Sequence, residues 1–166
     1  MDAFDNQKMI IGSVEWCGLA DLNIPAIKAR VDSGAKTSAI HAFNIEEFKR
    51  GEAFWVRFEL HPLQKNITTT VECEAEVIDR RLVKNSGGVA EERYVIKTPV
   101  SLGGKTWDIE LTLTNRDSMG YRMLLGREAM GGRVLVDPGE SLMLGKRSGA
   151  EIRKSYNIVR PEKAAR

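Results

Sequence analysis

Residues 26–35 of the chain are AIKARVDSGA, and this stretch decides the fold. Its apolar residues alternate with Lys28 and Arg30, which is the pattern of a β-strand with one buried face. The strand leads directly into Asp32, Ser33 and Gly34. Because glycine permits a tight turn and the close approach of a second backbone, we expect a turn that holds the Asp32 carboxylate at the edge of the core.

The same alternation recurs along the chain, between turns rich in glycine. Further strands are expected at residues 9–14, 54–60, 71–77, 94–98, 107–113, 123–125, 133–136 and 142–144. Turn signals lie at residues 85–88, 103–104, 131–132 and 137–139. This succession predicts an all-β fold, either a barrel or a closed sandwich. Helix is expected only as short turns at residues 127–130 and 45–49.

The composition is that of a globular domain. The 166 residues are 42% hydrophobic and 29% charged, and the net charge of +2 is too small to indicate nucleic acid or an anionic membrane as a partner. Residues 1–8 lack the basic start and apolar stretch of a secretory signal, and no apolar run approaches the roughly 20 residues that span a bilayer. We expect a cytoplasmic protein with no membrane or direct nucleic-acid partner, in which Cys17 and Cys73 are buried thiols rather than a disulfide.

The pattern divides the chain into three parts. Residues 1–10 form an N-terminal extension, and residues 11–145 form the globular domain. Residues 146–166 are rich in lysine and arginine and lose the alternation, so they are expected to form a loosely ordered or partner-ordered basic tail.

A carboxylate at the end of a buried strand has a chemical use. Burial and a like-charged neighbour raise the pKa of such a group, and two carboxylates in contact share one proton. One then acts as general base on a water molecule while the protonated one polarises a carbonyl group. Asp-Ser-Gly is also ordinary turn chemistry. The strand before Asp32, the strand-like residues 37–40 and the segment Leu124-Leu125-Gly126 far downstream favour the catalytic interpretation.

Five motifs together carry a resemblance to a known family. They are EW at 15–16, ARVDSGAKTS at 29–38, ELTLTNR at 110–116, YRMLLGR at 121–127 and VDP at 136–138. The chain resembles, over roughly residues 11–144, the retropepsin-like bacterial aspartic peptidases. That family also carries the label of putative ATP-dependent zinc proteases, and it includes the peptidase associated with a ligase that adds glutamates to a ribosomal protein.

The resemblance implies a retropepsin-like closed β-barrel with one lobe in each chain. It further implies a homodimer with one Asp32 from each subunit, loops held together by Ser33 and Gly34, and a flap that closes over the substrate. Residues 79–93 are the flap candidate, with Gly87-Gly88 at its tip; an ordinary long hairpin is the alternative.

A second carboxylate from the same chain is disfavoured. Asp137 lies in Val-Asp-Pro-Gly, but Pro138 has neither the hydroxyl nor the N–H that Ser33 offers to a facing loop. Asp137 is therefore expected to be a turn residue. Because the chain has about half the length of a two-lobed peptidase, a symmetric dimer follows.

No metal or cofactor is expected. His41 and His61 are separated, and the sequence has no His-Glu-x-x-His, no Cys-x-x-Cys and no complete phosphate-binding Gly-x-x-x-x-Gly-Lys-Ser/Thr motif. His41 is expected to be a structural or surface residue.

The substrate is expected to meet residues on both sides of the cleft. Ala35 has no hydroxyl to donate to Asp32, so we expect activity nearer neutral pH than in strongly acid-loving relatives. Lys36 stands where viral retropepsins carry an acidic residue that meets the substrate backbone. The expected substrate-binding residues are Ala35, Lys36, Thr37, Arg80, Arg81, Gly87, Gly88 and Arg116.

These residues indicate a homodimeric aspartic endopeptidase that acts on acidic peptides or on the glutamate-extended tail of a ribosomal protein. The alternative is a non-catalytic β-barrel module that binds an acidic protein tail without cutting it.

Overall fold

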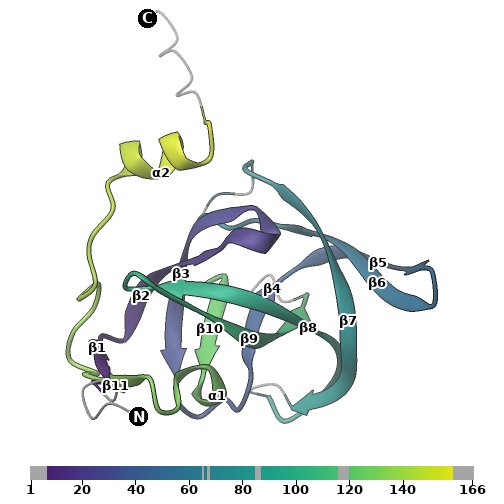
Figure 1. Ribbon diagram of the computed structural model, residues 1–166, viewed down its shortest axis with the longest axis horizontal. Coiled ribbons are helices and arrows are strands. Elements are labelled where there is room, and N and C mark those ends of the chain that lie inside the picture. The colour runs from purple at the N-terminus through teal and green to yellow at the C-terminus, as the bar shows by residue number, and fades with distance from the viewer. Residues whose placement is uncertain (1–6, 65, 67, 85–86, 116–119, 159–166) are drawn as a thin grey trace, which may run out of the picture.

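The computed structural model describes residues 7–64, 66, 68–84, 87–115 and 120–158 (Figure 1). The strands are β1 (Met9–Ile11), β2 (Val14–Leu19), β3 (Ile24–Asp32), β4 (Ser38–His41), β5 (Phe43–Arg50), β6 (Ala53–Leu60), β7 (Val71–Lys84), β8 (Ala90–Leu102), β9 (Lys105–Thr114), β10 (Met123–Gly126) and β11 (Val134–Val136). The helices are a 3₁₀ turn at Ala20–Leu22, α1 (Arg127–Met130) and α2 (Gly149–Ser155).

A closed ring of six strands forms the body of the molecule. Its order is β2-β3-β10-β4-β9-β8, and the pairing of Gly18 with Ser101 joins β8 back to β2. The alternating apolar residues fill its interior, where Ile27, Ile40 and Leu111 are fully buried. The prediction of an all-β fold closed into a barrel, with one lobe in the chain, is therefore confirmed.

The sheet continues beyond the ring through β7, β6 and β5, and the β5–β6 hairpin projects from the body (Figure 1). The expected helical turn at residues 45–49 is wrong, because these residues belong to β5. Asn44 adopts a left-handed conformation with φ of 51°, and the register shifts between Phe43 and Glu46. This bulge breaks the period-two pattern and hides the strand in the sequence.

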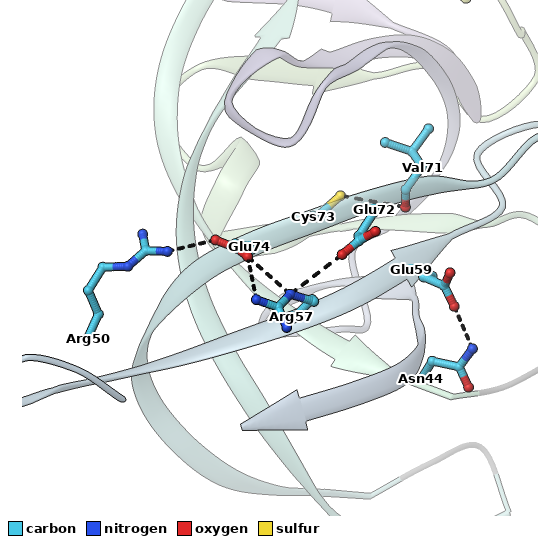
Figure 2. Close-up of polar contacts among 8 residues, drawn as sticks. All are labelled: Asn44, Arg50, Arg57, Glu59, Val71, Glu72, Cys73 and Glu74. Carbon is cyan, nitrogen blue, oxygen red and sulfur yellow. Dashed lines mark hydrogen bonds and ion pairs between the residues drawn. The ribbon is translucent and has the colours of Figure 1, made fainter. Parts of the chain in front are cut away.

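Charged side chains cover one surface of the outer sheet (Figure 2). Arg57 on β6 lies 2.9 Å from Glu74 on β7 and 3.5 Å from Glu72, while Arg50 on β5 lies 2.8 Å from Glu74. The hydrogen bond from Arg57 is the largest cause of the lowered pKa of Glu74, followed by that from Arg50. These pairs are solvent-exposed, so they contribute little to stability but join three neighbouring strands across the surface.

Residues 149–158 were expected to belong to a loosely ordered or partner-ordered tail, but they form α2 and the turn that follows it. Ser148 caps α2 by accepting the N–H of Glu151 at 3.1 Å, and Ile152 is buried. The Tyr156 hydroxyl then donates to the Ala26 carbonyl on β3. One apolar anchor and one part-buried hydrogen bond thus hold a helix whose sequence is mostly polar.

The expected strand at residues 142–144 is also wrong. Leu142 has a φ of 52°, and the backbone N–H groups of Met143 and Leu144 donate to the buried Glu15 carboxylate at 3.0 and 3.1 Å. These amides therefore serve a side chain rather than a strand ladder.

Cys17 and Cys73 are free and buried, as predicted. Burial raises the pKa of each thiol to about 12. Among the described residues, no helix has the length and apolar character needed to cross a bilayer.

Candidate active site

Asp32 is the last residue of β3, where three strands of the ring meet beside α1 (Figure 1). β3 runs parallel to β10, and Asp32 is the register partner of Gly126. β10 in turn pairs antiparallel with β4, so Met123 lies opposite Ile40. The chain thus enters and leaves the Asp32 turn through strands that flank the same short segment.

Gly126 allows the two segments to touch. Its N–H donates to the buried Ser38 hydroxyl at 3.0 Å. A Cβ at Gly126 would lie 2.7 Å from the carbonyl carbon of Thr37 and 2.9 Å from the backbone nitrogen of Ser38. Only glycine fits this contact, which is the packing expected of Leu124-Leu125-Gly126 behind the Asp32 turn.

The start of α1 holds the turn from the other side. The backbone N–H groups of Arg127 and Glu128 donate to the carbonyls of Ala35 and Lys36 at 2.8 and 3.1 Å. The Arg127 guanidinium also donates to the Gly34 carbonyl at 3.2 Å. Because these bonds go to the backbone, they fix the turn whatever its side chains are.

The Asp32 carboxylate is half-buried and oriented by its own turn. The Oδ1 atom of Asp32 accepts a hydrogen bond from the N–H of Gly34 at 3.0 Å, and the backbone carbonyl of Asp32 accepts one from the N–H of Ala35 at 3.2 Å. The Ser33 side chain is exposed beside it. One carboxylate oxygen is therefore held by a backbone donor, which is the arrangement expected of a positioned acid or base.

A cleft of about 880 Å³ lies between this turn and the β7–β8 hairpin. It is lined by Asp32, Gly34, Ala35, Lys36, Thr37, Ala39, Arg81, Leu82, Val83, Lys84, Arg93, Thr112 and Leu124. Among the described residues, Asp32 supplies the only carboxylate of this lining, whereas lysines and arginines supply four cationic groups. The lining of the cleft therefore places one carboxylate beside four cationic side chains.

The cleft brings together part of the predicted substrate-binding set. Ala35, Lys36, Thr37 and Arg81 line it. Lys36 is 67% exposed at its side chain and lies 3.7 Å from Glu128.

Arg80 lies away from the cleft. It forms an ion pair with Glu47 on β5 and stacks over the rings of Phe54 on β6 and Tyr94 on β8. Successive strand residues face opposite sides, so only one of two adjacent arginines can reach the cleft, and that one is Arg81.

The predicted flap is a hairpin formed by the long strands β7 and β8. Gly88 has a φ of 80°, and both Gly87 and Gly88 are exposed near the hairpin end without belonging to the cleft lining. Arg116 lies outside the described residues.

Arg81 is held firmly against the barrel. Its guanidinium donates to Glu110 at 2.7 and 3.2 Å and to Asp79 at 2.6 Å. The hydrogen bonds from Arg81 are the largest cause of the lowered pKa of both carboxyls. This arginine thus anchors β7 to β9 while it lines the cleft.

The predicted site residues leave out seven residues of the lining, which are Ala39, Leu82, Val83, Lys84, Arg93, Thr112 and Leu124. A signal for the arginine was present, because Arg81 and Arg93 lie at equal distances from Gly87 and are register partners in the hairpin. Lys84 forms no ion pair with any described carboxylate.

Asp137 is a turn residue, as predicted. Its Oδ1 accepts the N–H of Gly139 at 3.0 Å, and it does not line the cleft. His41 is buried in β4 beside Phe43, whose ring also packs against His61. Within the described part of the chain, no group of three or more His, Cys, Asp or Glu side chains has the arrangement of a metal site.

Comparison with known proteins agrees with this geometry. Residues 10–147 match the family model described as RimB-like, retropepsin-like aspartic endopeptidase RimB. The crystal structure of a DUF785 protein of unknown function from Legionella pneumophila superposes with a TM-score of 0.69 at 29% identity, covering 83% of this chain and 99% of that protein.

The chain is also similar to parts of longer proteins. A probable alpha-L-glutamate ligase from Shewanella pealeana is 55% identical over 159 residues, which are 96% of this chain and 35% of that protein. The probable alpha-L-glutamate ligase from Desulfotalea psychrophila is 57% identical over 152 residues, 92% of this chain and 33% of that protein. The chain thus spans about a third of the length of these curated relatives.

Proposed function

This chain belongs to the RimB-like family of retropepsin-like aspartic endopeptidases, and from that premise we propose that it acts as a homodimer with one Asp32 from each subunit. We propose acidic peptides as its substrates, and specifically the glutamate-extended tail of a ribosomal protein in the cytoplasm.

One observation carries the dimer. Among the described residues, a single carboxylate, that of Asp32, lines the cleft. Aspartic endopeptidase chemistry needs two carboxylates that share a proton. A two-fold axis beside Asp32 supplies the second one from an identical turn.

The reaction follows from that pairing. The ionised Asp32 takes a proton from a water molecule, and the water oxygen attacks the peptide carbonyl. The protonated Asp32 of the second subunit donates its proton to the carbonyl oxygen as the tetrahedral intermediate forms. The first carboxyl then gives the proton that it took from water to the amide nitrogen, while the second carboxylate takes a proton back from a hydroxyl of the intermediate. The C–N bond breaks, which leaves a carboxylic acid, a free amine and the starting protonation state of the two carboxyls. The carboxylate is held in place through both steps by the hydrogen bond from the Gly34 N–H to Asp32 Oδ1 and by the backbone hydrogen bonds between the turn and α1.

Two observations support an acidic substrate. Four cationic groups line the cleft, and three of them, Lys36, Arg81 and Arg93, pair with carboxylates. Lys84, which pairs with no described carboxylate, and the free edge of Arg93 attract a negatively charged peptide. Relatives that contain this domain are named probable alpha-L-glutamate ligases, and a ligase of that name makes a product rich in carboxylates. A peptidase in the same chain is suited to trimming such a product.

The test is incubation with a ribosomal-protein peptide that carries a glutamate tail and with the same peptide without the tail. Wild type is expected to shorten the tailed peptide, with products identified by mass spectrometry. Asp32→Asn is expected to leave it intact, and Asp137→Asn serves as the matched control that retains activity. Cleavage that persists in Asp32→Asn, or binding of the tailed peptide without any cleavage by wild type, contradicts the proposal.

A further inference from the structure

Arg93 is a buried cation in the wall of the cleft. Its side chain is only 7% exposed, and it lies on β8 directly opposite Arg81 on β7. Two like charges opposite each other in a sheet destabilise it unless each is compensated. The two arginines are compensated very differently.

Arg81 uses its guanidinium fully within the chain. It makes three hydrogen bonds to the carboxylates of Glu110 and Asp79, and these bonds raise its already high pKa. Its edge is therefore occupied. Arg81 serves as an anchor of the hairpin rather than as a free donor.

Arg93 keeps most of its donors unused. Its Nε donates to Glu91 Oε2 at 3.2 Å. Nη1 and Nη2, which carry the remaining four N–H groups of a guanidinium, have no hydrogen-bond partner among the described residues. Among the described residues, the buried side-chain atoms that lack a hydrogen-bond partner do not include Nη1 or Nη2 of Arg93, so this edge reaches solvent. Because Arg93 lines the cleft, an acceptor that enters the cleft can bind the free edge.

Glu91 pairs with Nε of Arg93 and forms no hydrogen bond with Nη1 or Nη2. The Glu91 side chain is 36% exposed, and the oxygen that pairs with Arg93 Nε also lies 3.5 Å from the Thr114 hydroxyl. Glu91 therefore orients the guanidinium while its own charge competes with any second carboxylate.

We propose that Arg93 determines the specificity of the cleft for acidic peptides, by binding a substrate carboxylate through its Nη1–Nη2 edge. The planar edge of a guanidinium matches the two oxygens of a carboxylate, which a lysine ammonium does not. A substrate glutamine offers this edge one neutral carbonyl oxygen where glutamate offers two charged oxygens, so glutamine binds more weakly and the site discriminates by charge. This inference rests on the proposed function, because it assigns the substrate class of the same cleft to one residue.

The test measures binding of two probes to the full chain carrying Asp32→Asn, which prevents cleavage. The probes are a fluorescein-labelled peptide with four glutamates and the same peptide with four glutamines, followed by fluorescence anisotropy. The glutamate peptide is expected to bind about tenfold or more tightly than the glutamine peptide. With Arg93→Gln added, the two affinities are expected to fall within about twofold, and glutamine-peptide binding stays unchanged.

Arg80→Gln is the matched control, because it removes the same charge from the neighbouring face without touching the cleft. It is expected to keep the preference for glutamate. Persistence of the preference in Arg93→Gln, or an equal loss of it in Arg80→Gln, overturns the inference.

A second variant is needed because Arg93→Gln could lose its binding preference by misfolding. Glu91→Gln removes the internal competitor and keeps Arg93, so it is expected to strengthen binding of the glutamate peptide by about two- to fivefold. Unchanged or weaker binding contradicts the inference. If cleavage depends on Asp32 but the two probes bind equally well, the role of Arg93 is contradicted and the proposed function stands. If the glutamate probe binds more tightly but wild type cleaves nothing, the proposed function is contradicted and the role of Arg93 stands.

Discussion

Gly126 is the register partner of Asp32 in the parallel pairing of β10 with β3, and its N–H donates a 3.0 Å hydrogen bond to the Ser38 hydroxyl. Asp32, where the turn begins, and Ser38, which follows the turn, are thus both tied to Gly126 far downstream. A Cβ there would lie 2.7 Å from the Thr37 backbone, so the contact excludes every side chain. The placement of Asp32 depends on this close approach of two backbones.

Gly126→Ala is expected to displace the Asp32 turn and to destabilise the fold by about 1–3 kcal/mol, because the added methyl group meets backbone that cannot rotate away. Urea denaturation followed by tryptophan fluorescence measures the loss, and peptide cleavage should fall more than the folded fraction does. Gly120→Ala is the control, because no atom lies within 4 Å of a Cβ at that position. Equal stability and activity of the two variants would contradict this role for Gly126.

Glu15 is a fully buried carboxylate that clamps two distant segments together. It accepts the N–H of Gly12 at 2.7 Å and the amides of Met143 and Leu144 at 3.0 and 3.1 Å. Glu15→Gln replaces one acceptor oxygen by an amino group that faces another donor, so we expect a loss of about 2–4 kcal/mol in unfolding free energy. Equilibrium denaturation measures it, with the exposed Glu52→Gln as control. Similar midpoints for both variants would show that the clamp carries little of the stability.

Glu110 gives a pH-dependent anchor for the β7–β8 hairpin. The hydrogen bond from Arg81 lowers its pKa below the ordinary value of 4.5, so the ionised form is favoured in the folded state. A lowered folded pKa adds stability that is present above the unfolded value and lost as pH falls through the folded value. Because the pair is about a third exposed, we expect no more than about 1 kcal/mol.

Glu110→Gln should therefore be less stable than wild type at pH values well above 4.5, and the difference should shrink as the pH falls below 4.5 and through the lowered folded-state pKa. Thermal unfolding across these pH values measures the difference, and amide exchange in residues 80–84 reports the hairpin itself. A difference that grows toward acidic pH would reverse the predicted sign and refute the anchor.

Sequence patterns predicted the parts of the fold in which side chains alternate strictly. β3, β7 and β9 follow the expected strands because one face of each packs on the barrel interior. β5 was not predicted, because its bulge at Asn44 shifts the alternation of apolar and polar residues along the strand. Residues 142–144 look like a strand by hydrophobicity, but Glu15 takes their amides instead.

The candidate site was predictable where one local motif contains it. The Asp32 turn and its glycine partner far downstream both carry recognisable residues. The wall of the cleft was harder, because it depends on which residues face each other across the β7–β8 hairpin. Arg80 and Arg81 are equivalent in the sequence, and only the pleat of β7 separates the outer surface from the cleft. The unpaired donors of Arg93 depend on which side chains lie beside it in the folded chain, and its position in a strand does not reveal them.

The sharing of one active site by two copies of Asp32 is tested most directly by mixing subunits. Wild type and Asp32→Asn are combined in equal amounts in urea, refolded together and assayed on the glutamate-tailed peptide. If each site needs both carboxylates, activity should fall to about one quarter of that of the same total amount of wild type, because only that fraction of random dimers has two intact chains. Activity of about one half would show that each chain works with its own Asp32 alone, and would contradict the account.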